Sequence, residues 1–455
     1  MSASHIVVIG GGLAGLQAAI ACADAGARVT LLEARDRLGG ATWSRQHRGL
    51  GFEIDNGQHV FMRCCDQYRG FLERLGVRDR VTLQERLAVP VARPGAGTVW
   101  IRRRGLPSPL HLAGSLLGYR PLSPADRLRA GLTARAIARL DPGDPALDDR
   151  SIGEWLAERG ETDEAIELFW EVLIRPTLNL AARDASLALA VKVLRTGFLD
   201  RPDGADIGWS KVPLDQLHAG PALRVLCARG AAVHLKTPVD GLEQWAGRSG
   251  TAVWAKGVRF DADAVIIAVP HEVAADLVTP IADCDLSSAR GLGQAPIANL
   301  HVVFDRRVLN LPFLAGVRSP LQWIFDRSET SGITKGQYLT VSLSDGGAYL
   351  GLSTAELRRI FVPAFEELLP RARQARVLSF AVTNERAATF RQAAGSRRLR
   401  PPPGELATGI FLAGAWTDTG WPATMEGAVR SGRTAAHAAI RHVTDSLGIE
   451  KTEAA

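Results

Sequence analysis

Hydrophobic residues along this chain alternate between short aliphatic runs and helix-spaced stretches, the order expected of parallel β/α units. Residues 6–9 form an all-aliphatic run, typical of a strand buried on both faces of a sheet. A glycine-rich segment follows, and the spacing then predicts a helix over 13–25 and a second strand over 28–32. Aliphatic runs at 264–269 and 410–413 predict two more strands of the same kind. The pattern therefore predicts an α/β fold built on a parallel sheet.

The middle of the chain carries further elements of this kind. The pattern predicts a helix over 213–229, a strand over 231–235 and a hairpin over 251–260. They lead directly into the buried strand at 264–269, so we expect this stretch to belong to the same domain as the N-terminal strands.

The first glycine-rich segment has the spacing of a dinucleotide-binding turn. It satisfies G-x-G-x-x-G between a strand and a helix, and an acid, Glu33, ends the next strand 21 residues beyond Gly12. The glycines of such a turn allow a tight bend, a close approach to a pyrophosphate, and close packing of helix on strand. Unpaired N–H groups at the helix start favour phosphate, and the acid suits a ribose hydroxyl. We expect an adenine dinucleotide to contact Gly10, Gly12, Leu13, Ala14, Gly15 and Glu33.

The next segment indicates which dinucleotide binds. Residues 33–40, with Ser44 shortly after, resemble the second glycine motif of flavoproteins in the amine oxidase and phytoene desaturase superfamily. The resemblance implies that FAD is the cofactor and that its diphosphate is wrapped by a loop containing Ala34, Arg37, Gly39 and Gly40. Residues 54–59 resemble the next conserved turn of the family, near the isoalloxazine ring, which implies FAD contacts at Asp55, Asn56, Gly57 and Gln58.

The C-terminal part of the chain resembles the closing flavin motif of the same superfamily. The strand at 410–413 runs into a turn, and a helix rich in small residues follows. The resemblance implies that this helix start faces the flavin, with contacts from Gly414, Thr424 and Met425. It also implies that the backbone near Val239 contacts the adenine.

Two positions depart from the family pattern. Ala415 stands where an acid usually contacts the ribityl chain, and Asp418 is a candidate replacement for it. Ala41 stands where amine oxidases often carry an arginine.

The flavin motifs are far apart in the chain, so their domain must be discontinuous. We expect a Rossmann-like FAD/NAD(P)-binding domain of the amine oxidase and glutathione reductase type, formed by residues 1–70, 205–275 and 405–445. A discontinuous α+β substrate-binding domain would take residues 71–204 and 276–404, and residues 446–455 would form a flexible tail.

Several inner segments resemble one branch of the superfamily, the squalene-associated flavoenzymes known as hydroxysqualene dehydroxylases. These segments are residues 55–61, 63–65, 175–180 and 412–427, and the match runs along nearly the whole chain. The resemblance implies reductive removal of the allylic hydroxyl of hydroxysqualene, a lipophilic triterpene, to give squalene in bacterial hopanoid biosynthesis. FADH2 would be consumed in this reaction.

The chemistry of such a reaction sets its own requirements. An acid must protonate the departing oxygen, and the developing allylic cation needs a low-dielectric pocket with π-faces or dipoles. Hydride transfer needs the carbon held close to the flavin. We hypothesise that Trp421 lines the flavin face and that Asp418 or His59 is the acid, because all three lie in flavin-adjacent motifs.

Three alternatives would use the same fold. A carotenoid- or phytoene-type desaturase would move hydride toward the flavin instead. A monoamine-type oxidase would carry a tyrosine directly before Met-Glu-Gly, where this chain has Thr424. A prenyl-binding chaperone would lack the flavin glycine motifs, which are intact here.

Composition fits a globular chain of two or three domains, with 455 residues, 46% of them hydrophobic and 22% charged. Five cysteines without C-x-x-C spacing are typical of reduced thiols in a cytosolic protein. The histidines show no metal-ligand spacing, so we expect no metal. We also expect no signal peptide and no membrane-spanning segment, which favours a cytoplasmic location.

The formal net charge of +6 has a local origin. Nine arginines and a single acid lie between residues 93 and 140, so the rest of the chain is slightly acidic. A local excess of this kind argues against a nucleic-acid partner. The apolar segment 106–119 follows Arg102, Arg103 and Arg104 and suits a stretch lying on an anionic membrane surface. A surface helical hairpin with solvated arginines is the alternative; the membrane interpretation predicts peripheral contact with the inner face of the cytoplasmic membrane.

Overall fold

A six-stranded sheet forms the centre of one half of the molecule. The computed structural model describes residues 4–245, 250–281 and 284–453. The strand order is β10-β2-β1-β14-β21-β20, formed by Ala232–His234, Arg28–Leu32, His5–Ile9, Ala264–Ile267, Ile410–Leu412 and Gly404–Ala407. The first five strands are parallel, and β20 is antiparallel at the edge. The prediction of a buried parallel sheet is confirmed.

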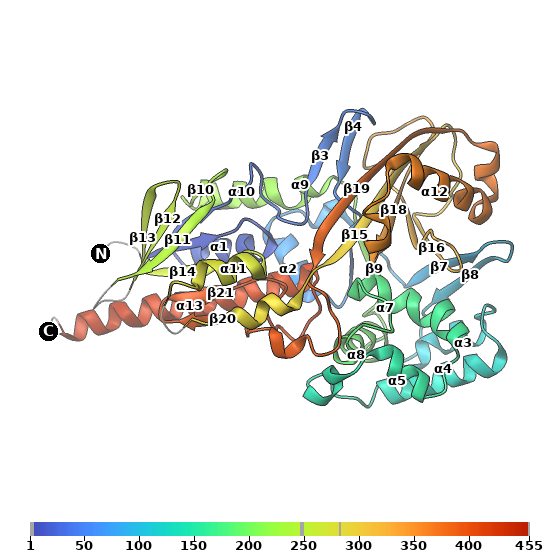
Figure 1. The fold of residues 1–455 in the computed structure, drawn as a ribbon, viewed down its shortest axis with the longest axis horizontal. Helices are drawn as coiled ribbons and strands as arrows, with labels where there is room; N and C mark the ends of the chain where they lie inside the picture. The colour runs from blue at the N-terminus through green and yellow to red at the C-terminus, as the bar shows by residue number, and fades with distance from the viewer. Residues whose placement is uncertain (1–3, 246–249, 282–283, 454–455) are drawn as a thin grey trace.

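Side chains of the central strand β1 alternate between the two faces of this sheet, as strand geometry requires. Ile6 and Val8 pack in one core with three helices, α1 (Leu13–Asp24), α10 (Ala219–Ala228) and α13 (Met425–Glu453). Val7 and Ile9 face a second core with α11 (His271–Val278) and the antiparallel sheet β11-β12-β13 (Val239–Gln244, Thr251–Ala255 and Val258–Ala262). Figure 1 shows α1 and α13 running beside the sheet.

A seven-stranded sheet forms the upper part of the other half (Figure 1). Its order is β19-β15-β18-β17-β16-β7-β8, formed by Val377–Thr389, Ala295–Phe304, Gln337–Ser344, Trp323–Asp326, Phe313–Gly316, Ala88–Arg93 and Gly97–Arg102. Helix α12 (Thr354–Leu368) covers one face, where Leu357, Phe361 and Phe365 join the core formed by the long strands.

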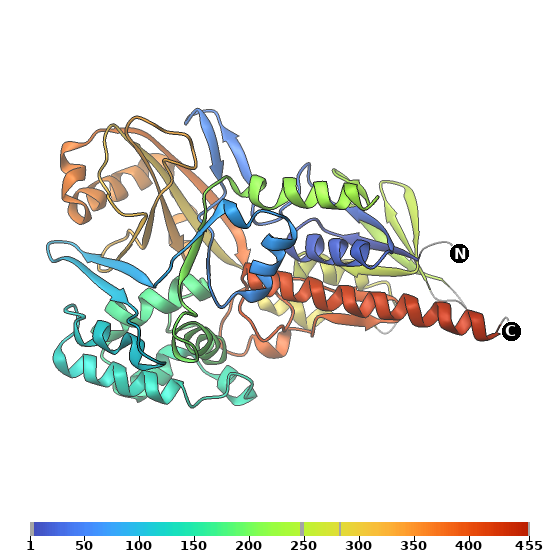
Figure 2. The ribbon, with the colours of Figure 1, turned by 180° about the vertical axis from the view of Figure 1, so that it is seen from behind.

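A helical region lies below this sheet, as Figures 1 and 2 show from opposite sides. It contains α3 (Ala113–Leu117), α4 (Pro124–Ile137), α5 (Ile152–Glu158), α6 (Asp163–Ala165), α7 (Glu171–Leu178) and α8 (Leu187–Val193). Two small antiparallel sheets and two short helices complete the fold. These are β3-β4 (Ser44–His47, Phe52–Asp55), β5-β9-β6 (Val60–Met62, Ile207–Ser210, Val81–Leu83), α2 (Asp66–Arg74) and α9 (Leu214–Leu217).

Two local predictions differ from the structure. The single helix expected over 213–229 is divided at His218 into α9 and α10, because the ring of Pro221 conflicts with the carbonyl four residues earlier and fits only in a first helical turn. The flexible tail expected from residue 446 is helical as far as Glu453; residues 454–455 lie outside the described residues.

The two large sheets draw on different parts of the chain. Apart from Gly404, every strand of the six-stranded sheet lies in the segments expected to bind FAD. Every strand of the seven-stranded sheet lies in the segments expected to bind substrate. The domain boundaries themselves stay a prediction.

Candidate functional site

The first glycine turn lies between β1 and α1. A Cβ added to Gly10 would lie 2.5 Å from the carbonyl oxygen of Ala268, and one on Gly15 would lie 1.9 Å from the carbonyl oxygen of Gly10. A Cβ on Gly12 would approach only the Cα of Gly40, at 3.8 Å, so this position borders open space. Helix α1 begins here without a side-chain cap, which leaves its first N–H groups facing outward to attract a phosphate. Those groups belong to Leu13, Ala14 and Gly15.

Glu33 ends β2 beside this turn and is buried. One of its carboxylate oxygens accepts from the N–H of Gly11 and the other from the N–H of Arg35, each at 2.7 Å. Each oxygen keeps a lone pair for a ribose hydroxyl. The segment leading into Val239 runs alongside, since the N–H of Thr237 donates to the Glu33 carbonyl at 2.8 Å. The structure therefore brings the two expected adenosine-binding segments together.

The second glycine loop packs directly on the first. The N–H of Gly39 donates to the carbonyl of Gly11 at 2.8 Å, and a Cβ on Gly40 would lie 2.8 Å from the Cα of Gly12. Arg37 closes the loop by donating to the Gly40 carbonyl at 3.2 Å. The loop from Ala34 to Gly40 thus lies where a pyrophosphate on the α1 N-terminus would be wrapped.

The turn after β4 is held by the seven-stranded sheet. Asp55 forms a buried ion pair with Arg327, with 2.8 Å between the carboxylate and Nη2. The carbonyl of Asn56 accepts two hydrogen bonds at 2.9 Å, from Nδ2 of Asn299 on β15 and from Oγ1 of Thr383 on β19. This turn is therefore fixed by strands that lie more than 200 residues away in the sequence.

Gly57 and Gln58 complete this turn. A Cβ on Gly57 would lie 2.7 Å from Asn299 Nδ2, so the turn needs glycine there. Gln58 and Gly57 border a small cavity together with Arg327. Asn299 Oδ1 is buried and has no hydrogen-bond partner among the described residues, which leaves one polar acceptor beside the expected isoalloxazine site.

The C-terminal motif meets the first glycine turn. The N–H of Gly414 donates to Ser431 Oγ at 2.8 Å. Thr424 directly precedes α13, and its hydroxyl accepts from the N–H of Gly427 at 3.2 Å. A Cβ on Gly432 would lie 2.1 Å from the carbonyl oxygen of Ala14, so α13 packs closely on the start of α1. The N-terminal and C-terminal halves of the site are therefore in contact, and Met425 lies in the first turn of α13.

The three residues predicted to be catalytic lie in different settings. Asp418 forms ion pairs with Arg397 at 3.2 Å and with Arg400 at 3.9 Å. His59 Nδ1 lies 3.1 Å from the carbonyl oxygen of Gly57, so this nitrogen carries a proton. Burial lowers the pKa of His59, which keeps its ring neutral near pH 7. Asp418 is thus engaged by two arginines, and His59 is a neutral ring, which is a weak proton donor.

Trp421, the third residue, lies between two cations. Lys192 Nζ is 5.0 Å from the centre of one of its rings, and the Arg430 guanidinium carbon is 4.8 Å away. Arg430 is paired with Glu426 at 2.6 Å. Lys192 has no ion pair with any residue that the structure describes. Its pKa is lowered by burial and then by repulsion from Arg430.

Several important residues were missed in the sequence. Arg400 is buried and donates to the carbonyls of Trp416, Thr417 and Trp421, which shapes the turn before α13. Burial lowers its pKa to about 10. No motif marks Asn299 or Arg400, and Glu426 lies in the C-terminal motif without having been given a role. Lys192 did carry a signal, because it is the single charge in the apolar run 187–194.

The residues present fit FAD. Gly12 leaves room beside an uncapped helix N-terminus, and the second glycine loop closes on that room. Glu33 keeps acceptor capacity next to the Val239 segment. The unpartnered Asn299 Oδ1 lies at the turn where the ring system is expected. Within the described part of the chain, no group of three His, Cys, Asp or Glu side chains could hold a metal ion.

Comparison with known families decides the assignment. The model of the family described as "Flavin containing amine oxidoreductase" matches residues 13–440, which is most of the chain.

The chain belongs to the flavin containing amine oxidoreductase family. The expected fold class, FAD as cofactor and oxidoreductase activity are confirmed by this membership. Because the flavin containing amine oxidoreductases span several chemistries, membership alone gives no substrate.

Individual relatives narrow the comparison. A hydroxysqualene dehydroxylase from Zymomonas mobilis is 28% identical, with 97% of this chain and 100% of that protein covered. A 15-cis-phytoene desaturase from Glycine max is 26% identical over 96% of this chain and 79% of its own length. Among solved structures, cyclohexylamine oxidase from Brevibacterium oxydans superposes with a TM-score of 0.68 at 21% identity, covering 97% of this chain and 100% of that one. The last similarity concerns the fold alone.

Proposed function

We propose that this flavoenzyme reductively removes the allylic hydroxyl of hydroxysqualene to give squalene, within bacterial hopanoid biosynthesis. Similarity to a hydroxysqualene dehydroxylase over 97% of this chain and 100% of that protein is the observation that carries this proposal. The inner segments 55–61 and 175–180, which resemble the same branch, support it as well.

The direction of the reaction determines which protein groups are needed. Dehydroxylation breaks a C–O bond, takes up one proton on the departing oxygen and one hydride on carbon, and releases water. Bound reduced FAD supplies the hydride and returns to its oxidised form. A desaturase does the reverse kind of work, because it takes hydride from the substrate and needs a base for the remaining proton. The protein must therefore hold a proton donor for the first reaction and a proton acceptor for the second.

Lys192 is our candidate for the proton donor that dehydroxylation needs. Its ammonium group lies 5.0 Å from the Trp421 ring centre and has no ion pair with any described residue. Burial lowers its pKa, so it releases a proton more readily than an ordinary lysine. We assign proton donation to Lys192, in place of Asp418 and His59.

The test combines product analysis with an isotope. Purified protein with its bound FAD is reduced without oxygen in D2O, where the flavin N5 hydrogen exchanges with solvent, and is incubated with hydroxysqualene. Squalene with one deuterium at the former carbinol carbon is expected. Oxidised enzyme without reductant is the control and should give none. Squalene lacking that deuterium would exclude hydride transfer from the flavin.

A phytoene-type desaturase is the second candidate, supported by the relative from Glycine max. Oxidised enzyme incubated with phytoene would then gain a double bond in the product, while hydroxysqualene would remain unchanged. An amine oxidase is disfavoured because Thr424 stands at the cage position and its hydroxyl accepts from Gly427 N–H. A prenyl-binding chaperone is disfavoured by the intact glycine turns.

A lipophilic substrate also bears on location. We propose that the enzyme works in the cytoplasm and reaches its triterpene by peripheral contact with the inner face of the cytoplasmic membrane. No helix within the described residues is long and apolar enough to cross a membrane.

A further inference from the structure

Large exposed hydrophobic side chains gather in one short part of the chain. Five of them lie between residues 106 and 132, on the loop before α3, on α3 and on α4. Leu117 is 69% exposed and Leu128 is 67% exposed, which is unusual for leucine beside a folded core. The full set is Leu106, Leu110, Leu117, Leu128 and Leu132.

Helix α4 is apolar on two opposite sides. Its inner side places Ala130, Thr133 and Ile137 in the protein interior. Its outer side carries Leu128 and Leu132, four residues apart and therefore on one face. That outer face continues at helical spacing with two exposed arginines, Arg135 and Arg139. A helix that is apolar outward as well as inward has a face without a partner in the fold.

Helix α3 adds to the same surface. The side chain of Leu116 reaches Gly131 on α4, where a Cβ would lie 3.5 Å from it. Arg127, also on α4, donates to the carbonyl of Leu117 at 2.6 Å. These contacts pack α3 against α4, so the exposed leucines of both helices belong to one local region of the fold.

Positive charge is concentrated in the same region of the chain as these leucines. The exposed arginines of this region form no ion pair with any described residue; they are Arg102, Arg104, Arg120, Arg135 and Arg139. The guanidinium of Arg102 lies over the Trp100 ring, 3.8 Å from its centre. Asp126, the one acid of the region, is already paired with Arg129 at 2.8 Å. The surface is therefore cationic as well as apolar.

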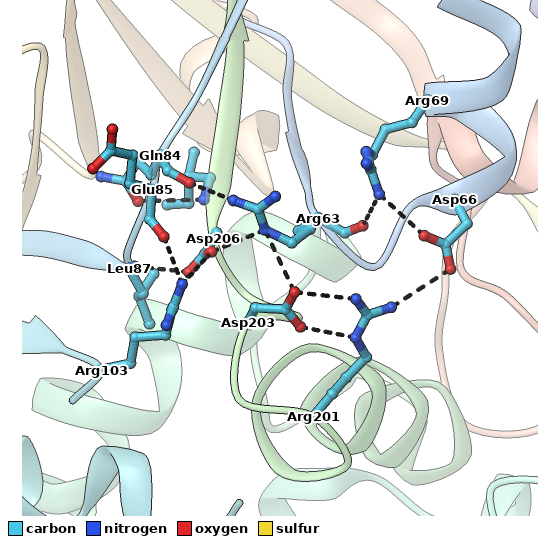
Figure 3. A network of polar contacts seen from close by, with 11 residues as sticks. Arg63, Asp66, Arg69, Gln84, Glu85, Leu87, Arg103, Arg201, Asp203 and Asp206 are labelled. Carbon is cyan, nitrogen blue, oxygen red and sulfur yellow. Dashed lines mark hydrogen bonds and ion pairs between the residues drawn. The ribbon is translucent and has the colours of Figure 1, made fainter. Parts of the chain in front are cut away.

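Arg103 is not part of this surface. Figure 3 shows it turned inward to the fully buried Asp206, with 2.6 Å between Arg103 Nε and the carboxylate. Asp206 also binds Arg63 at 2.9 Å. Removing Arg103 would leave Asp206 with less compensation in the interior. The sequence interpretation that grouped it with Arg102 and Arg104 on a membrane face is wrong for this residue.

We propose that the leucine–arginine face, defined as the five leucines and five exposed arginines above, seats the protein on an anionic lipid bilayer. Leucines enter the boundary between headgroups and acyl chains, while guanidinium groups bind lipid phosphates. We choose an anionic bilayer as the partner because its charge is opposite to that of the face, and each basic side chain near an anionic surface adds to the attraction. The assignment holds for any reaction of this flavoenzyme and does not depend on hydroxysqualene as substrate.

The test is flotation of the full-length holoenzyme with vesicles. Wild-type protein is expected to float with vesicles of phosphatidylcholine and phosphatidylglycerol, and at least tenfold less with pure phosphatidylcholine. Leu128→Ser/Leu132→Ser and Arg135→Ser/Arg139→Ser should each reduce binding about tenfold. The matched control is Leu378→Ser, a 57% exposed leucine on β19 outside this region, which should bind like wild type.

Three results would overturn the proposal. The first is that the wild type does not float with vesicles. The second is that it binds both vesicle types and that the double variants bind them as well as the wild type does. The third is that Leu378→Ser loses as much binding as the double variants. Size-exclusion chromatography tests whether a second copy of the chain covers this face instead of lipid. A wild-type dimer that becomes a monomer in Leu128→Ser/Leu132→Ser, without vesicle binding, would assign the face to a second copy of the chain. Retained FAD absorbance in each variant shows that the fold is intact.

Discussion

Glu426 caps a helix that lies 358 residues before it in the chain. Its Oε2 accepts from the backbone N–H of Tyr68 at 2.7 Å, and Oε1 accepts from the N–H of Gln67 at 3.2 Å. Both donors belong to the first turn of α2, whose N-cap residue offers no side-chain hydrogen bond. The carboxylate is almost fully buried. One acid at the start of α13 thus satisfies the free N–H groups of another helix and joins two ends of the site.

Replacing this acid should destabilise the fold strongly. Glu426→Ala leaves two buried N–H groups and Arg430 without their partner, so we expect a loss of about 3 kcal/mol in the free energy of unfolding. Glu426→Gln keeps an acceptor and should lose roughly half as much. Urea unfolding of the holoenzyme measures both. Equal stability of the alanine and wild-type proteins would contradict the capping role.

The isoalloxazine turn gives a second prediction. Gly57→Ala places a Cβ 2.7 Å from Asn299 Nδ2, so the turn must shift, at a cost of about 1–3 kcal/mol in stability. FAD should bind about tenfold more weakly, as measured by fluorescence titration of the apoprotein. Gly70→Ala is the matched control, since nothing lies within 4 Å of that Cβ on the exposed side of α2. There alanine should raise stability by about 0.5–1 kcal/mol. Unchanged FAD affinity in Gly57→Ala would show that the turn is distant from the flavin.

Lys192 provides a prediction about catalysis and pH. If it donates the proton, Lys192→Met should lower kcat for hydroxysqualene about 10²–10⁴-fold, with FAD content unchanged. The wild-type rate should fall as pH rises through the pKa of Lys192, which burial places below the ordinary 10.5. Lys192→Arg keeps the charge but cannot release its proton, so the rate should stay low and this pH dependence should vanish. A substrate whose leaving group needs no proton should restore the rate of Lys192→Met. If Lys192→Met still showed the wild-type fall in rate with rising pH, Lys192 would be excluded as the proton donor.

Two buried histidines predict acid sensitivity of the fold. Burial lowers the pKa of His218 and of His301 to about 3, against 6.5 in the unfolded chain. Between pH 6.5 and 3 the unfolded state therefore binds more protons, and stability must fall as pH falls. Each histidine contributes a slope of up to about 1.4 kcal/mol per pH unit in that window.

Urea titrations at pH 7, 6 and 5 test the assignment. In His301→Gln, the free energy of unfolding should depend less steeply on pH, because the contribution of one of the two histidines is removed. It should also destabilise the protein at pH 7, because His301 bonds Tyr338 at 2.7 Å and Thr383 at 2.9 Å. An identical slope in this variant would show that His301 is not buried in the neutral form.

The cofactor half of the site was largely readable from the sequence. Strand, glycine turn and helix follow one another within residues 6–25, and their roles depend on local backbone geometry. Gly15 is required by a contact within that unit, with the Gly10 carbonyl, and Gly10 has a φ of +104°, a local conformation that favours glycine. Because such requirements are local, they leave a pattern in consecutive residues.

The catalytic assignments were less readable for a physical reason. Asp418 and His59 lie in the expected motifs, yet Asp418 is paired with Arg397 and Arg400, and burial lowers the pKa of His59. Lys192 is distinguished by what it lacks, a carboxylate partner among the described residues. Pairing of charges is a property of three-dimensional neighbours, and these come from distant parts of the chain.

The arginine-rich region shows the same division. The sequence by itself determined that positive charge and leucines are concentrated between residues 93 and 140. Only the tertiary structure decided that Arg103 turns inward to Asp206 while Leu128 and Leu132 turn outward. Composition and periodicity depend on residues close in sequence, so they can be read along the chain. Which side chains are buried, paired or exposed depends on contacts between segments that folding brings together, and those contacts decide the chemistry of the surface and of the site.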